Sequence, residues 1–304
     1  MTIRPLAILD LPQLYRFREE AIGLDTARTL TRGNPLGAAR LLAYMNPSRH
    51  VYSAVANGEH DSVLGGIIHL RDETFAKLLY LAPASQLNHP GLPGLIENLS
   101  AQAGMWGAFH VLAEVDEMSD AFVPLRQAGF SVYAWQRLWD VSDVTESGSS
   151  LDWTRVRSIQ LPAVQSLFHQ IVPPLLHPIE PQPKTPIGWI SNDGAKCYVS
   201  VTHGMYGIVL TPLIHPEAKD VNSKLAALIS NLPDRRGRPV YICVRSYQAW
   251  LEPVLADLGA KAAARQAVMV KHLARLVKEG QTAPAVPSGV TVQPSRVSHV
   301  EGKK

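Results

Sequence analysis

Residues 81–91 read Leu81-Ala82-Pro83-Ala84-Ser85-Gln86-Leu87-Asn88-His89-Pro90-Gly91. The pattern is typical of an apolar strand that runs through a proline into a turn and then a helix. A second passage of this kind is Leu210-Thr211-Pro212-Leu213-Ile214-His215. After each passage the sequence predicts a helix, an apolar strand, a short helix and a glycine break. The glycine of this break lies 46 residues after Pro83 in the first case, at Gly129, and 47 residues after Pro212 in the second, at Gly259. Because order and spacing agree, the sequence predicts that one fold occurs twice.

The start of the repeat has a marker of its own. Leu9-Asp10-Leu11-Pro12-Gln13-Leu14 is matched by Ile159-Gln160-Leu161-Pro162-Ala163-Val164. From this proline to the strand proline the first copy has 71 residues and the second has 50. Six prolines crowd residues 173–186 of the second copy, and helices do not tolerate that density. We therefore expect an extended Pro-rich segment there, in place of a helix.

The predicted fold class is α/β (α+β), with two consecutive domains that each have a mixed, mostly antiparallel sheet flanked by helices. The expected limits are 1–142 for the first domain, 143–152 for a linker, 153–278 for the second domain and 279–304 for a disordered tail. In the first copy the predicted strands are 2–7, 51–56, 62–70, 76–81, 109–115 and 132–141. The predicted helices are 10–22, 34–44, 92–105 and 120–127.

Composition sets outer bounds on function. A chain of 304 residues that is 46% hydrophobic can form two ordinary cores, and a net charge of +3 is too small to indicate a nucleic-acid surface. No secretory signal and no apolar run of roughly 20 residues is found, and the histidines lack metal-ligand spacing. Cys197 and Cys243 lie in apolar runs, as buried free thiols do. We expect a cytoplasmic protein with no membrane, nucleic-acid or metal partner, and the oligomeric state stays open.

The repeated pattern resembles the GNAT superfamily of N-acetyltransferases, in a tandem form. In that superfamily the fourth strand ends in a bulge whose free backbone groups pair with the pantetheine arm of acetyl-CoA. A loop of the form R/Q-x-x-G-x-G/A then presents helix N-terminal amides to the pyrophosphate. The resemblance implies that the first copy is an acyl-CoA N-acyltransferase domain whose cofactor residues would be Leu81, Ala82, Pro83, Gln86, His89, Gly91 and Gly94.

The phosphate loops of both copies depart from the family pattern. The first copy has His89 in place of the first glycine, and Pro90 and Pro93 each remove an amide donor. The second copy reads His215-x-x-Ala218-x-Asp220, which retains neither glycine. Asp220 is expected to be an N-cap for a helix at 221–231. Acetyl-CoA, as co-substrate, is therefore expected in the N-terminal copy alone.

The usual catalytic residues of the superfamily are also replaced. The tyrosine that protonates the departing thiolate corresponds to Leu125 and Leu255, and a glutamate base on strand four corresponds to Phe75 and Gly204. The replacement candidates are carboxylates at a strand end that could deprotonate an amine, and a phenol on the last strand. Each has a plainer interpretation, as a solvated strand end, a packed aromatic or, for His89, an exposed loop residue. The candidates are Glu114, Glu117 and Tyr133.

Two functions follow from this resemblance. The first is acetyl-CoA-dependent N-acyl transfer to the amine of a small molecule or peptide. The alternative is a catalytically inactive binding or regulatory protein that retains the fold, which the degenerate loops of both copies favour. Because the acceptor wall is the variable part of such a fold, the sequence does not name the substrate.

Overall fold

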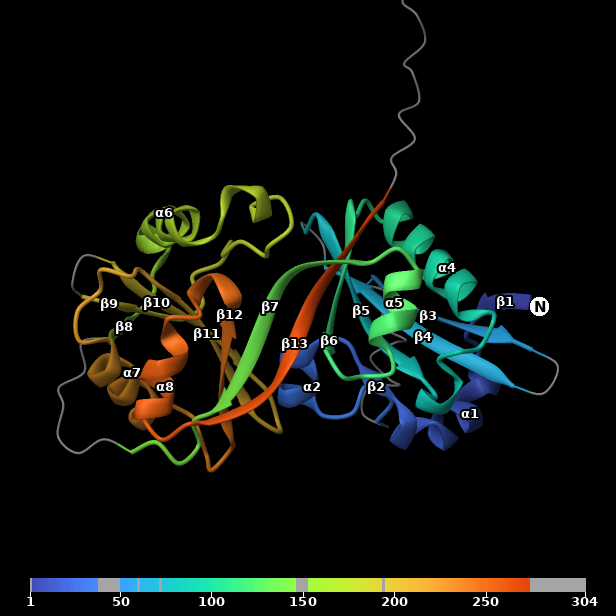
Figure 1. Ribbon diagram of the computed structural model, residues 1–304, viewed down its shortest axis with the longest axis horizontal. Coiled ribbons are helices and arrows are strands. Elements are labelled where there is room, and N and C mark those ends of the chain that lie inside the picture. The colour runs from blue at the N-terminus through green and yellow to red at the C-terminus, as the bar shows by residue number, and fades with distance from the viewer. Residues whose placement is uncertain are drawn as a thin grey trace, which may run out of the picture. The chain divides into compact units, whose positions relative to one another are not determined.

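The computed structural model describes residues 2–37, 50–58, 61–70, 73–145, 153–192 and 195–273. These residues form one sheet of thirteen strands with helices packed against it (Figure 1). The expected tail and most of the expected linker lie outside the described residues. The strands are β1 Thr2–Pro5, β2 Ile22–Gly23, β3 His50–Asn57, β4 Ser62–His69, β5 Phe75–Ala82, β6 His110–Asp116, β7 Ser131–Asp140, β8 Trp153–Arg155, β9 Trp189–Ser191, β10 Cys197–His203, β11 Ile208–Ile214, β12 Val240–Arg245 and β13 Lys261–His272.

Helices alternate with these strands along the chain. The α-helices are α1 Leu11–Arg16, α2 Thr26–Arg32, α4 Leu92–Met105, α5 Phe122–Gln127, α6 Leu161–Ile171, α7 Val221–Ser230 and α8 Leu251–Asp257. Short 3-10 helices are η1 Ile8–Asp10, η2 Arg18–Glu20, η4 Ala84–Gln86, η5 Ser158–Gln160, η6 Pro174–Leu176 and η7 Ser246–Gln248. None of the described helices is long and apolar enough to cross a membrane.

The last strands of the two copies are exchanged. The sheet order is β1-β3-β4-β5-β6-β13-β7-β12-β11-β10-β9-β8, with β2 beside β5. Strand β13, from the end of the second copy, pairs with β6 of the first copy, and β7 of the first copy pairs with β12 of the second. The two long strands also pair with each other and run side by side through the centre of Figure 1. Each copy therefore completes its sheet with a strand from the other, and the domain limits given above stay a prediction.

Each copy contains one parallel strand pair that soon separates. Residues 75–77 of β5 pair with 110–112 of β6, and residues 208–210 of β11 pair with 240–242 of β12. Beyond these registers the paired strands diverge, which leaves one edge of β5 and one edge of β11 to other partners. These two splayed edges are where the resemblance places the cofactor.

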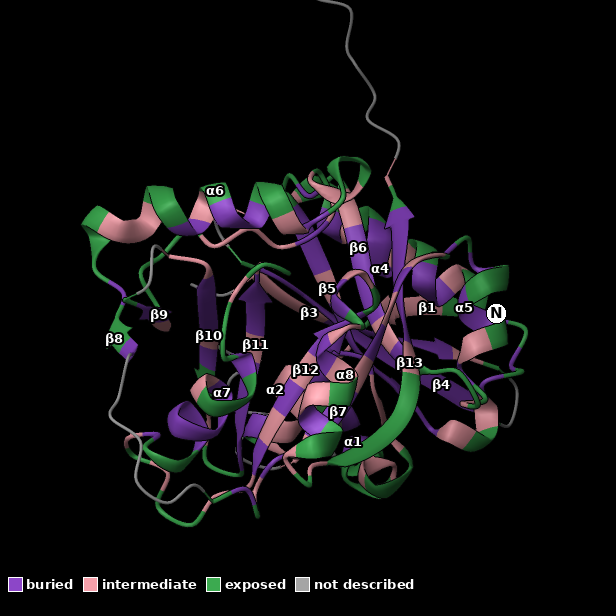
Figure 2. Ribbon diagram, turned by 60° about the vertical axis from the view of Figure 1, so that its left-hand side comes forward, coloured by how far each residue is buried: buried purple, intermediate pink, exposed green. Residues whose placement is uncertain are grey.

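Helix α4 illustrates how the sequence builds the core. It begins after Gly91 with a proline in its first turn, where a missing N–H costs nothing. Its buried positions Leu92, Leu95, Ile96 and Leu99 recur at helical spacing and join the same core as strands β3 to β6. Figure 2 shows these strands as largely buried, while the helices carry mixed faces. Leu99 also lies against Gly65, where an added Cβ would come within 2.9 Å of its Cδ1.

Two predicted helices of the first copy were wrong in extent. The first helix ends at Arg16 rather than near Ile22, because Ile22 instead forms a strand pair with Leu81. The second helix is α2, which Asp25 caps by accepting a hydrogen bond from the Arg28 amide at 3.3 Å. Of the predicted helix at 34–44, residues 34–37 are not helical and residues 38–44 lie outside the described part of the chain.

The Pro-rich segment 173–186 crosses onto the first copy. Beyond η6 it has no regular structure, as its prolines predict. Ile179 packs beside Phe75 and Leu112 of the first copy, and the Lys184 ammonium lies 2.9 Å from the Glu73 carboxylate. In return, α2 of the first copy packs against β10 and β11 of the second, with the Tyr206 amide donating to the Thr31 carbonyl at 3.1 Å. Each copy therefore covers part of the other.

Candidate functional site

The splayed edge of β5 is bonded to another segment of the chain. Strand β2 pairs antiparallel with β5, with Ile22 opposite Leu81 and Gly23 opposite Tyr80. The Leu24 amide donates to the Leu79 carbonyl at 2.9 Å, and the Leu24 carbonyl accepts from the Glu114 amide of β6 at 2.9 Å. Residues 22–24 therefore bridge β5 and β6 where these strands diverge. The register shift between Gly66 and Ile67 of β4 places a bulge at the same height of β5.

The loop after β5 also uses its amides internally. His89 is buried, and its Nδ1 accepts a hydrogen bond from the Gly91 amide at 3.0 Å, while the Leu92 amide donates to the His89 carbonyl at 2.9 Å. Pro93 has no amide hydrogen. At Gly94 a side chain would come within 2.9 Å of Ile3, so this glycine lets α4 approach β1. The sequence did not predict these structural tasks of His89 and Gly94.

These contacts decide how the predicted cofactor residues fit an acyl-CoA. Leu81 and Ala82 are fully buried in β5, and Pro83, Gln86, His89, Gly91 and Gly94 follow in the expected order. The edge of β5 and two amides of the loop already have partners within the chain. An acyl-CoA therefore does not fit this edge in the arrangement described. The assignment of these residues to a cofactor stays a prediction.

In the second copy one side chain fills the corresponding edge. The Gln248 amide nitrogen donates to the Pro212 carbonyl at 2.8 Å, and its Oε1 accepts from the Ile214 amide at 2.9 Å. Gln248 is 1% exposed. Asp220 does stand before α7, but it has a left-handed backbone (φ 55°) and its side chain makes no capping bond, contrary to expectation. The second copy thus supplies a carboxamide of its own to the edge of β11.

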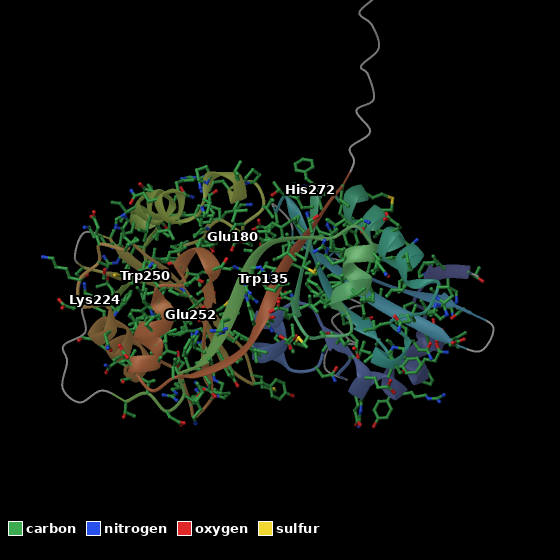
Figure 3. The ribbon with its side chains drawn as sticks, in the orientation of Figure 1. Trp135, Glu180, Lys224, Trp250, Glu252 and His272 are labelled. Atoms are coloured by element: carbon green, nitrogen blue, oxygen red, sulfur yellow. The ribbon has the colours of Figure 1, made fainter. Side chains whose placement is uncertain are left out.

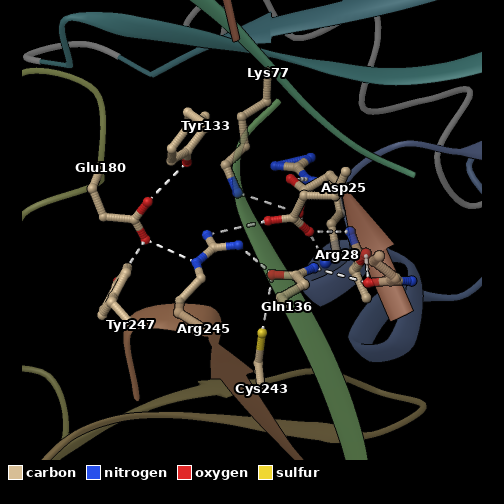
Figure 4. A network of polar contacts seen from close by, with 12 residues as sticks. Asp25, Arg28, Lys77, Tyr133, Gln136, Glu180, Cys243, Arg245 and Tyr247 are labelled. Atoms are coloured by element: carbon tan, nitrogen blue, oxygen red, sulfur yellow. Dashed lines mark hydrogen bonds and ion pairs between the residues drawn. The ribbon is translucent and has the colours of Figure 1, made fainter. Parts of the chain in front are cut away.

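Two of the three predicted catalytic residues meet in a buried ionic network (Figure 4). Arg245, on β12, lies with its Nε 2.9 Å from Glu180 Oε1 and its Nη2 3.6 Å from Glu114 Oε1. Tyr133 donates to Glu180 Oε2 at 2.8 Å and Tyr247 donates to its Oε1 at 3.2 Å. Figure 3 shows Glu180, from the Pro-rich segment, beside the long strand β7. Three donors thus satisfy Glu180, and Arg245 is shared between two carboxylates.

A second part of the network lies on the first copy. Lys77 of β5 contacts the Asp25 carboxylate at 3.4 Å, and the Thr26 amide donates to Glu114 Oε2 at 2.9 Å. On the other side, Gln136 Oε1 accepts hydrogen bonds from Arg245 and from the Cys243 thiol. Charged groups of both signs alternate through this interior, as buried charges require.

The network shifts several proton equilibria. Burial raises the pKa of Tyr133 well above its usual value, and the charge of Glu180 raises it further. Burial would lower the pKa of Arg245, but the charges of Glu180 and Glu114 outweigh this and raise it. Burial would raise the pKa of Asp25, yet Lys77 and Arg28 together lower it. Tyr133 therefore remains a neutral phenol, with its proton directed at Glu180.

Glu114 and Tyr133 line one small cavity, together with Lys77, Arg245 and Pro181. Its volume is about 10 Å³, the room that one water molecule takes. Glu117 lies apart from it, exposed, with its amide bonded to the Arg265 carbonyl at 3.1 Å. The sequence analysis missed Lys77, Glu180 and Arg245. A charged residue at the end of the apolar run 240–244 was the available signal for Arg245.

A larger groove lies elsewhere, beside α6 of the second copy. It has a volume of about 320 Å³ and is open to solvent. Its polar lining comes from α6 and from the ends of β10 and β11, namely Ser166, Gln170, Lys196, His215 and Glu217. Among the described residues no group of three or more histidines, cysteines or carboxylates is placed to hold a metal ion.

Comparison with known proteins identifies the fold. No known family profile and no curated protein sequence matches the chain. A GCN5-related N-acetyltransferase from Sphaerobacter thermophilus aligns over 89% of this chain and 95% of its own, at 14% identity and a TM-score of 0.55. A tandem GNAT protein from the clavulanic acid biosynthesis pathway aligns over 89% and 98%, at 13% identity and a TM-score of 0.53. The chain has the tandem GNAT fold, and the predicted fold class is confirmed.

Proposed function

We propose that this chain is a binding or regulatory protein with the N-acetyltransferase fold, which in its resting state does not use acetyl-CoA at either copy. One observation carries the proposal. The splayed edge of each copy is bonded to the protein's own groups, residues 22–24 in the first and Gln248 in the second. A buried edge with satisfied hydrogen bonds offers nothing to a new ligand, because each bond gained would replace one lost.

Titration calorimetry of the full chain with acetyl-CoA tests this function. We expect a Kd weaker than about 1 mM, which corresponds to less than about 4 kcal/mol of binding free energy. A micromolar Kd together with acetylation of any amine in a panel of small-molecule and peptide acceptors would contradict the proposal.

N-acyl transfer by the first copy is the second candidate. It is supported by Glu114 and Tyr133, which come from separate strands and line one cavity where β5 and β6 diverge. On this account Glu114 would take the proton of an amine acceptor, and acetyl-CoA would occupy the first copy alone. Glu114→Gln should then lower kcat by roughly 10²-fold, the usual loss of a general base. Glu117→Gln is the matched control, since this exposed carboxylate lies outside the cavity.

We also place the protein in the cytoplasm. Cys197 and Cys243 are not joined to each other by a disulfide. Cysteines that stay outside disulfides are typical of reducing compartments. Localisation of a tagged chain by fractionation tests this placement.

A further inference from the structure

The two copies close their splayed edges by different means. In the second copy the closing group is the side chain of Gln248, which is buried and follows β12 directly within η7. In the first copy it is a short piece of main chain, Ile22–Leu24, that lies between η2 and α2. Gln248 is fixed within a buried turn. Ile22–Leu24 is a connection between two short helices, and to leave β5 it would give up the bonds of the Leu24 carbonyl and the Thr26 amide to Glu114.

The segment Ile22–Leu24 binds β5 as an extended ligand would. Its contacts with the edge are backbone pairs and one backbone hydrogen bond, from the Leu24 amide to the Leu79 carbonyl at 2.9 Å. An extended ligand with amide groups would make contacts of the same kind. Ile22 and Gly23 are only half-buried, whereas Leu24 is 1% exposed and belongs to the core of the first copy. Leu24 is therefore the anchor that favours the closed arrangement.

We propose that Ile22–Leu24 act as an internal ligand of β5. The edge of β5 is then a latent binding site, which a ligand with amide groups can occupy only after this segment has left. Gln248 keeps the second copy shut. A chain with the segment released then has one site, and a chain with the segment held in place has none. The exchange breaks no covalent bond, and it replaces one set of backbone hydrogen bonds by another.

A release variant and a locked variant test the proposal, with acetyl-CoA as the probe. Leu24→Ser removes the anchor and leaves the backbone donor in place. Ile22→Cys with Leu81→Cys joins two residues that lie directly opposite each other, so that oxidation holds the segment on β5. Thr2→Cys with Asn57→Cys, an opposed pair on β1 and β3, is the matched cross-link control.

We expect Leu24→Ser to bind acetyl-CoA about tenfold more tightly than the unmodified chain, because release raises the fraction of open molecules. Oxidation of the Ile22→Cys/Leu81→Cys pair should abolish binding, and oxidation of the control pair should not. Equal affinity in the released, locked and unmodified chains overturns the proposal, and so does a failure of every chain to bind. If the unmodified chain binds acetyl-CoA and acetylates an amine, the proposed function is wrong. In that case the latent site is supported only if the oxidised Ile22→Cys/Leu81→Cys chain no longer binds acetyl-CoA.

Hydrogen exchange tests the same point without substitution. In the unmodified chain, a large excess of acetyl-CoA, which the weak expected Kd requires, should make the Leu24 amide exchange faster than in the free chain. Binding that leaves Leu24 protected overturns the proposal, since the ligand would then occupy another place.

Discussion

Buried polar side chains, each with partners inside the protein, stabilise the arrangement of both copies. The sequence placed Glu114 at a strand end and Tyr133 on the last strand, and the two line one small cavity, while their catalytic role stays a prediction. The pairing of Arg245 with Glu180 could not be predicted, since it joins residues that lie 65 positions apart and Glu180 belongs to a segment without regular structure. His89 was expected in a cofactor loop, and in the structure its Nδ1 accepts a hydrogen bond from the amide of Gly91, two residues further along the chain.

Replacing Gln248 with leucine should destabilise the protein. Leucine has a similar size but cannot pair with the Pro212 carbonyl or the Ile214 amide, which would both be left unsatisfied in the core. Each such group costs about 1–3 kcal/mol. Urea unfolding measures the loss, and Gln170→Leu, on the exposed face of α6, should change stability by less than about 0.5 kcal/mol. A Gln248→Leu chain as stable as the unmodified one would show that the edge is not sealed by this side chain.

Arg245 should be the most sensitive charged residue of the interior. Arg245→Met leaves the carboxylates of Glu180 and Glu114 buried without their cation. Removing one partner of a buried pair typically costs about 3–5 kcal/mol. The double variant Arg245→Met/Glu180→Gln should recover part of the loss, as a double-mutant cycle by chemical unfolding can measure. Additive losses in that cycle would contradict direct coupling.

Most elements could be predicted from the sequence, and the exceptions lie in residues 17–37. Apolar periodicity placed strands β3 to β7 and helix α4, whose cores are local. The same reasoning extended α1 too far. It also omitted β2, because a strand of two residues is too short to show periodicity. Its position is set by the splayed edge of β5, and no local pattern encodes that partner.

Helix α2 should become less firmly held in acid. Asp25 caps it and contacts Lys77, and the net effect of its surroundings is to lower its pKa. A lowered folded-state pKa adds stability at pH values above the unfolded-state value of about 4, and this stability is lost as the pH falls through the folded-state value. The stability difference between the unmodified chain and Asp25→Asn should therefore be largest near neutrality and shrink in acid. A difference independent of pH from 7 to 2 would contradict this account.

The repeat itself could be predicted at the scale of the whole molecule, from the matched proline and glycine spacings. The exchange of β7 and β13 could not, because a strand that pairs within its own copy and one that pairs with the other copy carry the same pattern of side chains. Sequence periodicity fixes which face of a strand is buried, whereas the choice of neighbour depends on the complete sheet.

The two copies should not fold separately. A fragment ending at residue 145 lacks β13, the strand that completes its sheet beside β6, and a fragment beginning at residue 153 lacks β7 beside β12. We expect each fragment alone to lack cooperative unfolding, and the co-expressed pair to assemble into a folded complex. Circular dichroism with thermal unfolding and co-purification measures both outcomes. A fragment of residues 1–145 that unfolds cooperatively as a monomer would contradict the expectation.

The exchanged strands also constrain how the sequence of such a chain can evolve. A copy that gives up its ligand-binding residues still provides the strand without which its neighbour has an open edge. Deleting that copy would therefore remove the fold of both, while substitutions in its phosphate loop leave the shared sheet intact. The exchange thus lets both halves lose binding residues independently and still be inherited together.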